Sequence, residues 1–167
     1  LAFIDGFSEA VGGKTDPYEI AEILHDALLL RMTYAYQEDG VTPSDAPWAH
    51  SILGAAENGA GVCESYARTF QLLLNAYGVE NIFISGTADG TPHAWNLISL
   101  GESGWYWCDV TWDDNIAENS SLATVSVYFC RTDTEQITGI GKEDGYSFLT
   151  GHTPDTADLP ARAENPY

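Results

Sequence analysis

Two stretches of the chain repeat apolar residues at the interval of an α-helix. In the first, aliphatic residues recur every three or four positions from residue 20 to residue 30. The preceding Asp16-Pro17-Tyr18-Glu19 is typical of a helix start, with an N-cap acid, a proline in the first turn and a capping-box glutamate. The second stretch has the same spacing and ends before a glycine. We therefore predict helices over 17–35 and 63–77.

Beyond residue 78 the pattern changes to short runs of aromatic and β-branched residues separated by glycine-containing turns, which is typical of strands. A long turn-rich segment, 37–60, separates the two helices, and we expect a short helix within it at 49–57. Helices followed by an antiparallel sheet indicate an α+β fold. We expect one domain over 1–167, with a core of about 16–150 and a surface tail at 153–167. The predicted strands are 81–85, 93–100, 104–112 and 125–130, with a further one at 146–149.

Composition supports a folded domain and narrows its partners. The chain has 167 residues, 44% of them hydrophobic, which argues against disorder. Its 25 acidic and six basic residues give a formal charge of −19, which repels nucleic acid and anionic membranes, so we exclude both as main partners. Basic substrates would be attracted, but solubility is the simpler role for this charge. No stretch approaches the ~20 apolar residues of a membrane span. The chain starts without an initiator methionine or signal peptide, as a trimmed chain would, so this end indicates no compartment.

Three short strings supply the parts of a thiol acyl-transfer site. Cys63 follows a glycine and a valine at the start of the second predicted helix, where free N–H groups and the helix dipole favour a thiolate. His93 begins a predicted strand and would act as the base. Asp109 stands among Trp107, Cys108, Val110 and Trp112, where a buried carboxylate would need a partner such as an imidazolium. These residue types predict a nucleophile, a base and a carboxylate that orients the base.

Strand parity decides whether the histidine and the aspartate can meet. A three-residue loop at 101–103 would pair Leu100 with Gly104, and hence Trp95 with Asp109. His93 and Asp109 would then lie on one face as diagonal neighbours, within reach of a cross-strand contact. A loop with an even number of residues would place them on opposite faces.

The remaining candidates are weaker. The count of three cysteines leaves at least one thiol unpaired, and we expect Cys108 and Cys130 to be buried thiols rather than a disulfide. Ser65 is interpreted as a helix-surface hydroxyl. The histidines other than His93 are scattered, and without CxxC or HExxH spacing we predict no metal site and no cofactor. The candidate substrate-binding residues are Trp48, Trp95, Trp107 and Trp112; core packing is the alternative role for about half of the rings between 105 and 112.

The strings Gly61-Val62-Cys63-Glu64-Ser65-Tyr66-Ala67, His93-Ala94-Trp95-Asn96 and Asp109-Val110-Thr111-Trp112-Asp113-Asp114 resemble those of bacterial transglutaminase-like domains in the papain-like thiol superfamily. The resemblance runs from about Tyr18 to Arg131. It implies a helix carrying the cysteine packed on an antiparallel sheet carrying the histidine and aspartate, with Cys63, His93 and Asp109 as the catalytic triad. It does not imply calcium, because no such site can be matched here. It leaves the oxyanion donor open, with Trp48 or a residue of the long loop as candidates.

Members of that superfamily cross-link Gln to Lys, deamidate, hydrolyse amide bonds or have lost activity. We therefore expect a cysteine acyltransferase or hydrolase that acts on a peptide or protein. Cell-wall-derived peptides are among the candidate substrates. The alternative is a non-catalytic module of a bacterial surface protein that binds a peptide or glycan on the same scaffold. The acidic, tyrosine-rich composition favours an extracellular or cell-surface location. The oligomeric state is not indicated.

Overall fold

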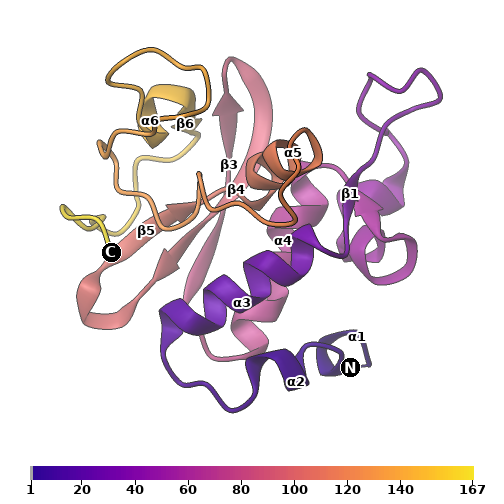
Figure 1. Ribbon diagram of the computed structural model, residues 1–167, viewed down its shortest axis with the longest axis horizontal. Helices are drawn as coiled ribbons and strands as arrows, with labels where there is room; N and C mark the ends of the chain where they lie inside the picture. Colours follow the sequence, from indigo (N-terminus) through magenta and orange to yellow (C-terminus); the bar gives the residue numbers. More distant parts are fainter. Residues whose placement is uncertain (1) are drawn as a thin grey trace.

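The computed structural model describes residues 2–167, and it shows the longest helices packed on one face of an antiparallel sheet (Figure 1). α4 contacts β3 and β4 of the sheet and also contacts α3 and α5. The helices are α1 (Ala2–Asp5), α2 (Ser8–Val11), α3 (Pro17–Leu29), α4 (Cys63–Ala76), α5 (Val110–Glu118) and α6 (Phe148–Gly151). The strands are β1 (Thr33–Tyr34), β2 (Ala60–Gly61), β3 (Asn81–Ala88), β4 (Thr91–Ser99), β5 (Trp105–Cys108) and β6 (His152–Pro154).

Both predicted helices form. α3 starts as expected, because the Asp16 carboxylate accepts the backbone N–H of Glu19 at 3.0 Å and Pro17 occupies the first turn. It ends at Leu29 rather than near 35, since the backbone at Thr33 pairs with β2 instead of continuing the helix. α4 follows the expected range to within one residue and buries Tyr66 and Phe70 against the sheet and α3.

The main sheet has the order β5-β4-β3-β6, all antiparallel. Leu97 faces Trp107 and Ser99 faces Trp105, which is the register predicted from a three-residue loop, so that prediction is confirmed. β4 is buried on both faces. Ile98 belongs to the core under the helices, whereas Trp95 belongs to a second core on the opposite face of the sheet.

Two of the strand predictions are wrong, and a third strand is shorter than predicted. The strand predicted over 104–112 stops at Cys108, because the Asp109 carboxylate caps a new helix, α5, by accepting the N–H of Trp112 at 3.1 Å. Residues 125–130 form no regular strand. Their backbone is bent at Cys130, whose φ is +53°, and the N–H groups of Val127 and Tyr128 bind the Asp113 carboxylate instead of a neighbouring strand. The segment 146–149 leads into the short helix α6.

The long segment between the helices is only partly regular. It contains a 3₁₀ turn, Pro47–His50, and a short π-helical turn, Gly54–Asn58, where a helix was expected at 49–57. Its first part projects away from the helices and sheet beside β1 (Figure 1).

The ends of the chain contribute more to the core than the pattern suggested. Phe7, near the start, is completely buried, and His152 joins β6 to the sheet, so the packed region extends beyond 16–150. Most residues of 153–167 are exposed, although the Ala163 N–H donates to Trp105 O at 2.9 Å and Tyr167 stacks on Tyr18.

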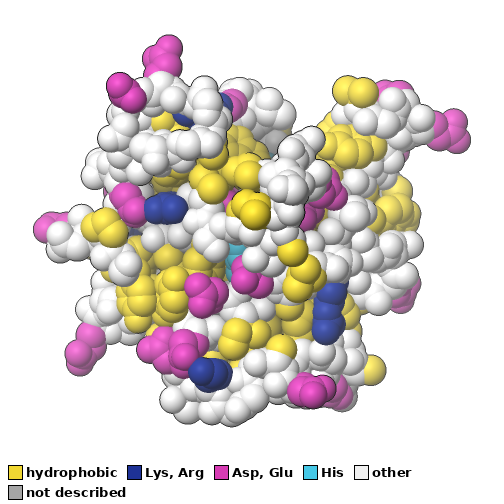
Figure 2. Space-filling view, viewed as in Figure 1, with side chains coloured by type: hydrophobic (Ala, Val, Ile, Leu, Met, Phe, Trp, Pro, Cys, Tyr) yellow, Lys and Arg dark blue, Asp and Glu magenta, His cyan; other side chains and the backbone are white. Residues whose placement is uncertain are grey.

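In Figure 2 the acidic side chains are spread over the visible face rather than gathered in one patch.

Within residues 2–167 all three cysteines are free thiols; Cys108 and Cys130 are buried, and the Cys130 N–H donates to Cys108 Sγ at 3.3 Å. No helix in this range has the length and apolar character needed to cross a bilayer.

Candidate active site

Three elements bring the predicted cysteine, histidine and aspartate together. Cys63 is the first residue of α4, His93 is the third residue of β4, and Asp109 is the N-cap of α5. Asn96 fixes the position of α4 on the sheet, because its side chain donates to Ala67 O at 3.0 Å and both residues are buried. The first residue of α4, Cys63, is thereby held beside the first residues of β4, which include His93.

Cys63 is half-buried and follows Val62, whose extended backbone turns the chain into α4. A glycine is required at position 61, because a Cβ there would collide with the Ser65 side chain. Ser65 is buried, not on the helix surface as predicted, and its hydroxyl donates to Ser51 O at 2.7 Å. Its hydroxyl is therefore occupied by a structural bond, which leaves Cys63 as the nucleophile candidate at this helix end.

His93 is the residue that connects the thiol to the carboxylate. Its Nε2 donates to Asp109 Oδ2 at 2.7 Å, and the Cys63 side chain lies close enough to favour the protonated ring. Burial by itself lowers the pKa of His93, but the Asp109 charge, the hydrogen bond to Asp109 and the nearby Cys63 side chain outweigh it and raise the pKa to about 10. At neutral pH the ring is therefore an imidazolium, which is the form that stabilises a neighbouring thiolate.

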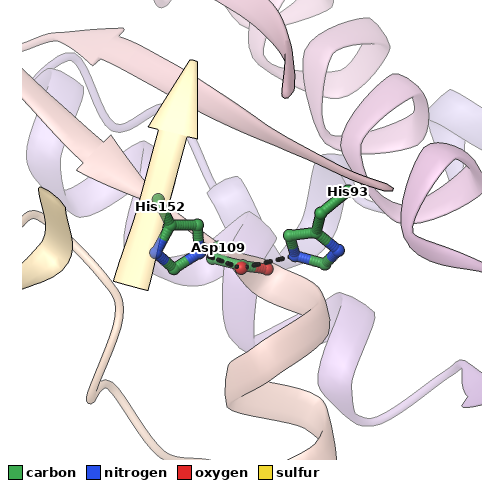
Figure 3. A group of neighbouring side chains, drawn as sticks. All are labelled: His93, Asp109 and His152. Atoms are coloured by element: carbon green, nitrogen blue, oxygen red, sulfur yellow. Dashed lines mark hydrogen bonds and ion pairs between the residues drawn. The ribbon is translucent and has the colours of Figure 1, made fainter. Parts of the chain in front are cut away.

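Asp109 is completely buried and accepts three hydrogen bonds. Oδ1 accepts the Trp112 N–H at 3.1 Å, and Oδ2 accepts from His93 and from His152, the latter at 2.8 Å (Figure 3). Although burial raises the pKa of this carboxyl group, the two histidines hold it well below its usual range. Asp109 is therefore ionised throughout the physiological pH range.

His152 was missed by the sequence reasoning. It lies 43 residues after Asp109, at the start of β6, where it pairs with Ala88 of β3. No motif or periodicity surrounds it. The only nearby sign in the sequence that this segment is buried is the apolar Phe148, four residues earlier. In the structure Phe148 is buried, and its carbonyl oxygen lies 3.1 Å from His152 Nδ1.

Cys63 and His93 face a cavity of about 460 Å³. Trp112, one of the predicted substrate-binding residues, lines it. Trp48 is half-buried and lies outside its lining. For Trp95 and Trp107 the prediction is wrong, because both rings are completely enclosed in the second core. Further lining residues are Tyr34, Tyr36, Asp89, Thr111 and Asn115.

Tyr34 is a further site residue that the sequence reasoning did not single out. It pairs with Gly61 in the short parallel β1–β2 ladder, which brings its ring to the start of α4. Burial, followed by the nearby Cys63 side chain, raises the pKa of the phenol, whereas the backbone amide of Cys63 opposes the rise. The Tyr34 hydroxyl and the Cys63 amide therefore meet beside the thiol, where an oxyanion would need donors.

Another buried histidine, His25, binds an aspartate of α5 and so supports the helix that carries Asp109. His25 of α3 contacts Asp113 Oδ2 at 3.0 Å and Asp26 Oδ1 at 2.9 Å through its two ring nitrogens. Burial lowers the pKa of His25, but both carboxylates oppose it and raise the pKa to about 9. Burial also raises the pKa of Asp113. Its ionised form is favoured by His25 and by the N–H groups of Val127 and Tyr128, and with the protonated His25 it forms an ion pair. This pair ties α3 to α5, whose N-cap is Asp109.

The ion pair predicts a pH-dependent stability. The folded protein holds the His25 proton more tightly than the unfolded chain, whose histidine pKa is 6.5; the stabilisation is therefore complete below pH 6.5 and is lost as the pH rises to about 9. We expect His25→Gln to lower the free energy of unfolding by roughly 3 kcal/mol in the acidic part of this window. The difference between wild type and variant, measured by urea unfolding, should shrink as the pH rises; a pH-independent difference would contradict the ion pair. His50→Gln, at a partly exposed histidine, is the control.

The group His93, Asp109 and His152 also has the composition of a metal site, with one ligand atom from each residue within 4.8 Å of the others. In this structure each Nε2 atom donates to Asp109 Oδ2 instead.

Residues 5–110 match the sequence model of the transglutaminase-like superfamily. This range contains Cys63, His93 and Asp109 and ends 42 residues before His152. The chain belongs to the transglutaminase-like superfamily. Among curated proteins, none matches this sequence.

Two solved structures share the fold. A protein described as a TGase is similar with a TM-score of 0.55 and 16% identity, over 66% of this chain and 30% of the other. The periplasmic domain of TgpA from Pseudomonas aeruginosa is similar with a TM-score of 0.51 and 18% identity, over 71% of this chain and 44% of the other. This chain therefore spans less than half the length of either structure.

Proposed function

We propose that the protein is a cysteine-dependent acyltransferase or amide hydrolase in which Cys63 is the nucleophile, His93 the general base and acid, and Asp109 the group that orients His93. The observation that carries the proposal is that Cys63 and His93 face the same cavity, where the ring of His93 is held by a 2.7 Å hydrogen bond to the buried Asp109. A family in which this chemistry is common supports it.

The chemistry follows from the orientation of the ring. Because His93 Nε2 is bonded to Asp109, Nδ1 is the nitrogen left to serve Cys63. The thiolate attacks an amide carbonyl, and the oxyanion that forms is stabilised by the Cys63 amide and the Tyr34 hydroxyl. The carbon–nitrogen bond breaks as Nδ1 gives its proton to the departing amine, which leaves a thioester on Cys63. Water or a second amine then attacks the thioester while His93 takes a proton from it, and the carbon–sulfur bond breaks to release the acyl product and the Cys63 thiolate.

The substrates proposed are peptides or proteins, because the cavity is open enough for a side chain and its walls mix aromatic and polar groups. Transfer and hydrolysis share the thioester and differ only in the acceptor. The extracellular or cell-surface location stays a prediction.

Thiol alkylation tests the nucleophile without knowledge of the substrate. We expect iodoacetamide near neutral pH to label Cys63 at least ~100-fold faster than Cys108 or Cys130, which are buried, as followed by peptide mass spectrometry. His93→Ala should slow Cys63 labelling about tenfold or more, because the thiolate loses its imidazolium partner. Asp155→Ala, at an exposed carboxylate on the sheet edge outside the cavity lining, should change the rate less than about threefold. Slow and equal labelling of all three thiols would instead favour a non-catalytic binding module.

A further inference from the structure

His152 is enclosed by aromatic rings. Its side chain is completely buried, and Phe148 stacks on it with ring centroids 4.0 Å apart and an interplanar angle of 16°. Trp112, Trp95 and Tyr128 surround it at 4.4, 5.0 and 5.9 Å. The faces of aromatic rings attract cations, so this cage suits a charged imidazole better than a neutral one.

Both ring nitrogens of His152 face acceptors. Nδ1 lies 3.1 Å from the carbonyl oxygen of Phe148, and Nε2 lies 2.8 Å from Asp109 Oδ2. Neither a carbonyl nor an ionised carboxylate can donate, and a neutral imidazole carries only one N–H. Both contacts can be hydrogen bonds at the same time only when the His152 ring carries two protons, so the geometry favours that form.

His152 and His93 thus share one carboxylate oxygen from opposite sides (Figure 3). This arrangement matters when His93 gives its proton to a leaving group and becomes neutral. Without His152, Asp109 would then be a buried carboxylate with no counter-charge, which is strongly unfavourable. With His152 in place, Asp109 and His152 remain a neutral pair whatever the state of His93.

We propose that His152 is a positioning residue that keeps Asp109 ionised and fixed while His93 Nδ1 transfers its proton to the departing amine. The inference rests on the proposed function. In the step concerned, the carbon–nitrogen bond of the tetrahedral intermediate breaks, its electron pair takes the proton from His93, and the oxyanion electrons re-form the carbonyl of the thioester. His152 exchanges no proton.

The surrounding backbone holds His152 in place. The Asp89 N–H donates to Gly151 O at 2.8 Å, and His152 pairs with Ala88. A side chain at position 151 would collide with the Tyr146 hydroxyl, so the close approach of Tyr146 depends on the glycine there. The polar end of His152 is thereby directed at Asp109 by β6 rather than by a loop.

The charge of His152 can be measured in the resting protein. Proton–nitrogen correlation spectra of ¹⁵N-histidine-labelled protein near neutral pH should show both ring nitrogens of His152 protonated, with the signal assigned by its loss in His152→Gln. A neutral tautomer would overturn the proposal. This measurement does not depend on turnover, so it is independent of whether the proposed function holds.

The kinetic role of His152 is tested with two ester substrates, of which only one has a leaving group that needs a proton. Gln at position 152 offers Asp109 a neutral donor, and acylation by phenyl acetate, whose leaving group needs a proton, should slow about tenfold or more. Acylation by 4-nitrophenyl acetate, which needs none, should change less than about threefold. Equal losses with the two esters would mean that His152 is only structural and would overturn the proposal. Wild-type protein that reacts with neither ester would overturn the proposed function, while the spectra still decide the charge.

Discussion

Cys63→Ala is expected to abolish every reaction that passes through a thioester, lowering turnover by about 10⁶-fold, the scale seen when a covalent nucleophile is removed. The change should leave folding intact, because Cys63 is half-buried at the first position of α4, where alanine is well tolerated. The measurement is release of ammonia from a glutamine-containing peptide, and formation of a hydroxamate when hydroxylamine is the acceptor. Hydroxamate as the main product would indicate transfer, because hydroxylamine then outcompetes water for the thioester. Free acid as the main product would indicate hydrolysis.

Ser65→Ala provides the matched control for that experiment. Ser65 is the neighbouring hydroxyl on the same helix, and its loss removes one buried hydrogen bond, to Ser51 O, at a cost of about 1 kcal/mol. Turnover should stay within a few-fold of wild type when it is assayed well below the unfolding temperature. Activity that survives in Cys63→Ala but disappears in Ser65→Ala would reverse the assignment of the nucleophile.

α5 is more than the support of one catalytic residue. Three acids at its start are buried, and each binds a different part of the molecule: Asp109 binds β4 and β6, Asp113 binds α3 and the loop at 127–128, and Asp114 accepts the Tyr66 hydroxyl of α4. Burial raises the pKa of Asp114 to about 7, despite the opposing hydrogen bond from Tyr66. The helix therefore fixes the carboxylate of the site relative to the helix that carries the thiol.

The sequence could predict the parts of the site that depend on local rules. The 3.6-residue period located α4, and the three-residue loop after Leu100 set the register that brings His93 to Asp109. The length of β5 could not be predicted in this way. The residues from Trp107 to Trp112 favour a strand by composition, but the bond from Trp112 N–H to the Asp109 side chain stabilises a helix start instead.

The missed residues depend on contacts between distant parts of the chain. His152 meets Asp109 only because β6 pairs with the far end of β3, and His25 meets Asp113 across 88 residues. A lone histidine in a segment without periodicity carries no sign of such a partner. The buried tryptophans were misassigned for a related reason, since β4 is covered on both faces and alternation does not reveal which face a substrate reaches.

Asp109→Asn is expected to lower turnover by about 10³- to 10⁴-fold, as the loss of the orienting carboxylate does in serine hydrolases. Asparagine can still cap α5 through its carbonyl oxygen, so the helix start is retained. Its amide nitrogen, however, would face the Nε2 atoms of His93 and His152, which now donate. His93 would have to carry its proton on Nδ1 instead, and a neutral ring with that tautomer cannot take a proton from the thiol.

The same substitution removes the carboxylate that binds two buried histidines, His93 and His152, so we also expect the free energy of unfolding to fall by roughly 3 kcal/mol. Iodoacetamide labelling of Cys63 near neutral pH should slow at least about tenfold, which gives a readout that does not depend on a substrate. Asp155→Asn is the control, because Asp155 is an exposed carboxylate at the sheet edge that accepts only a 3.2 Å bond from Ser85 among side chains. Labelling that stays fast in Asp109→Asn would show that the thiolate forms without an ionised carboxylate behind His93, and the proposed triad would then reduce to a pair.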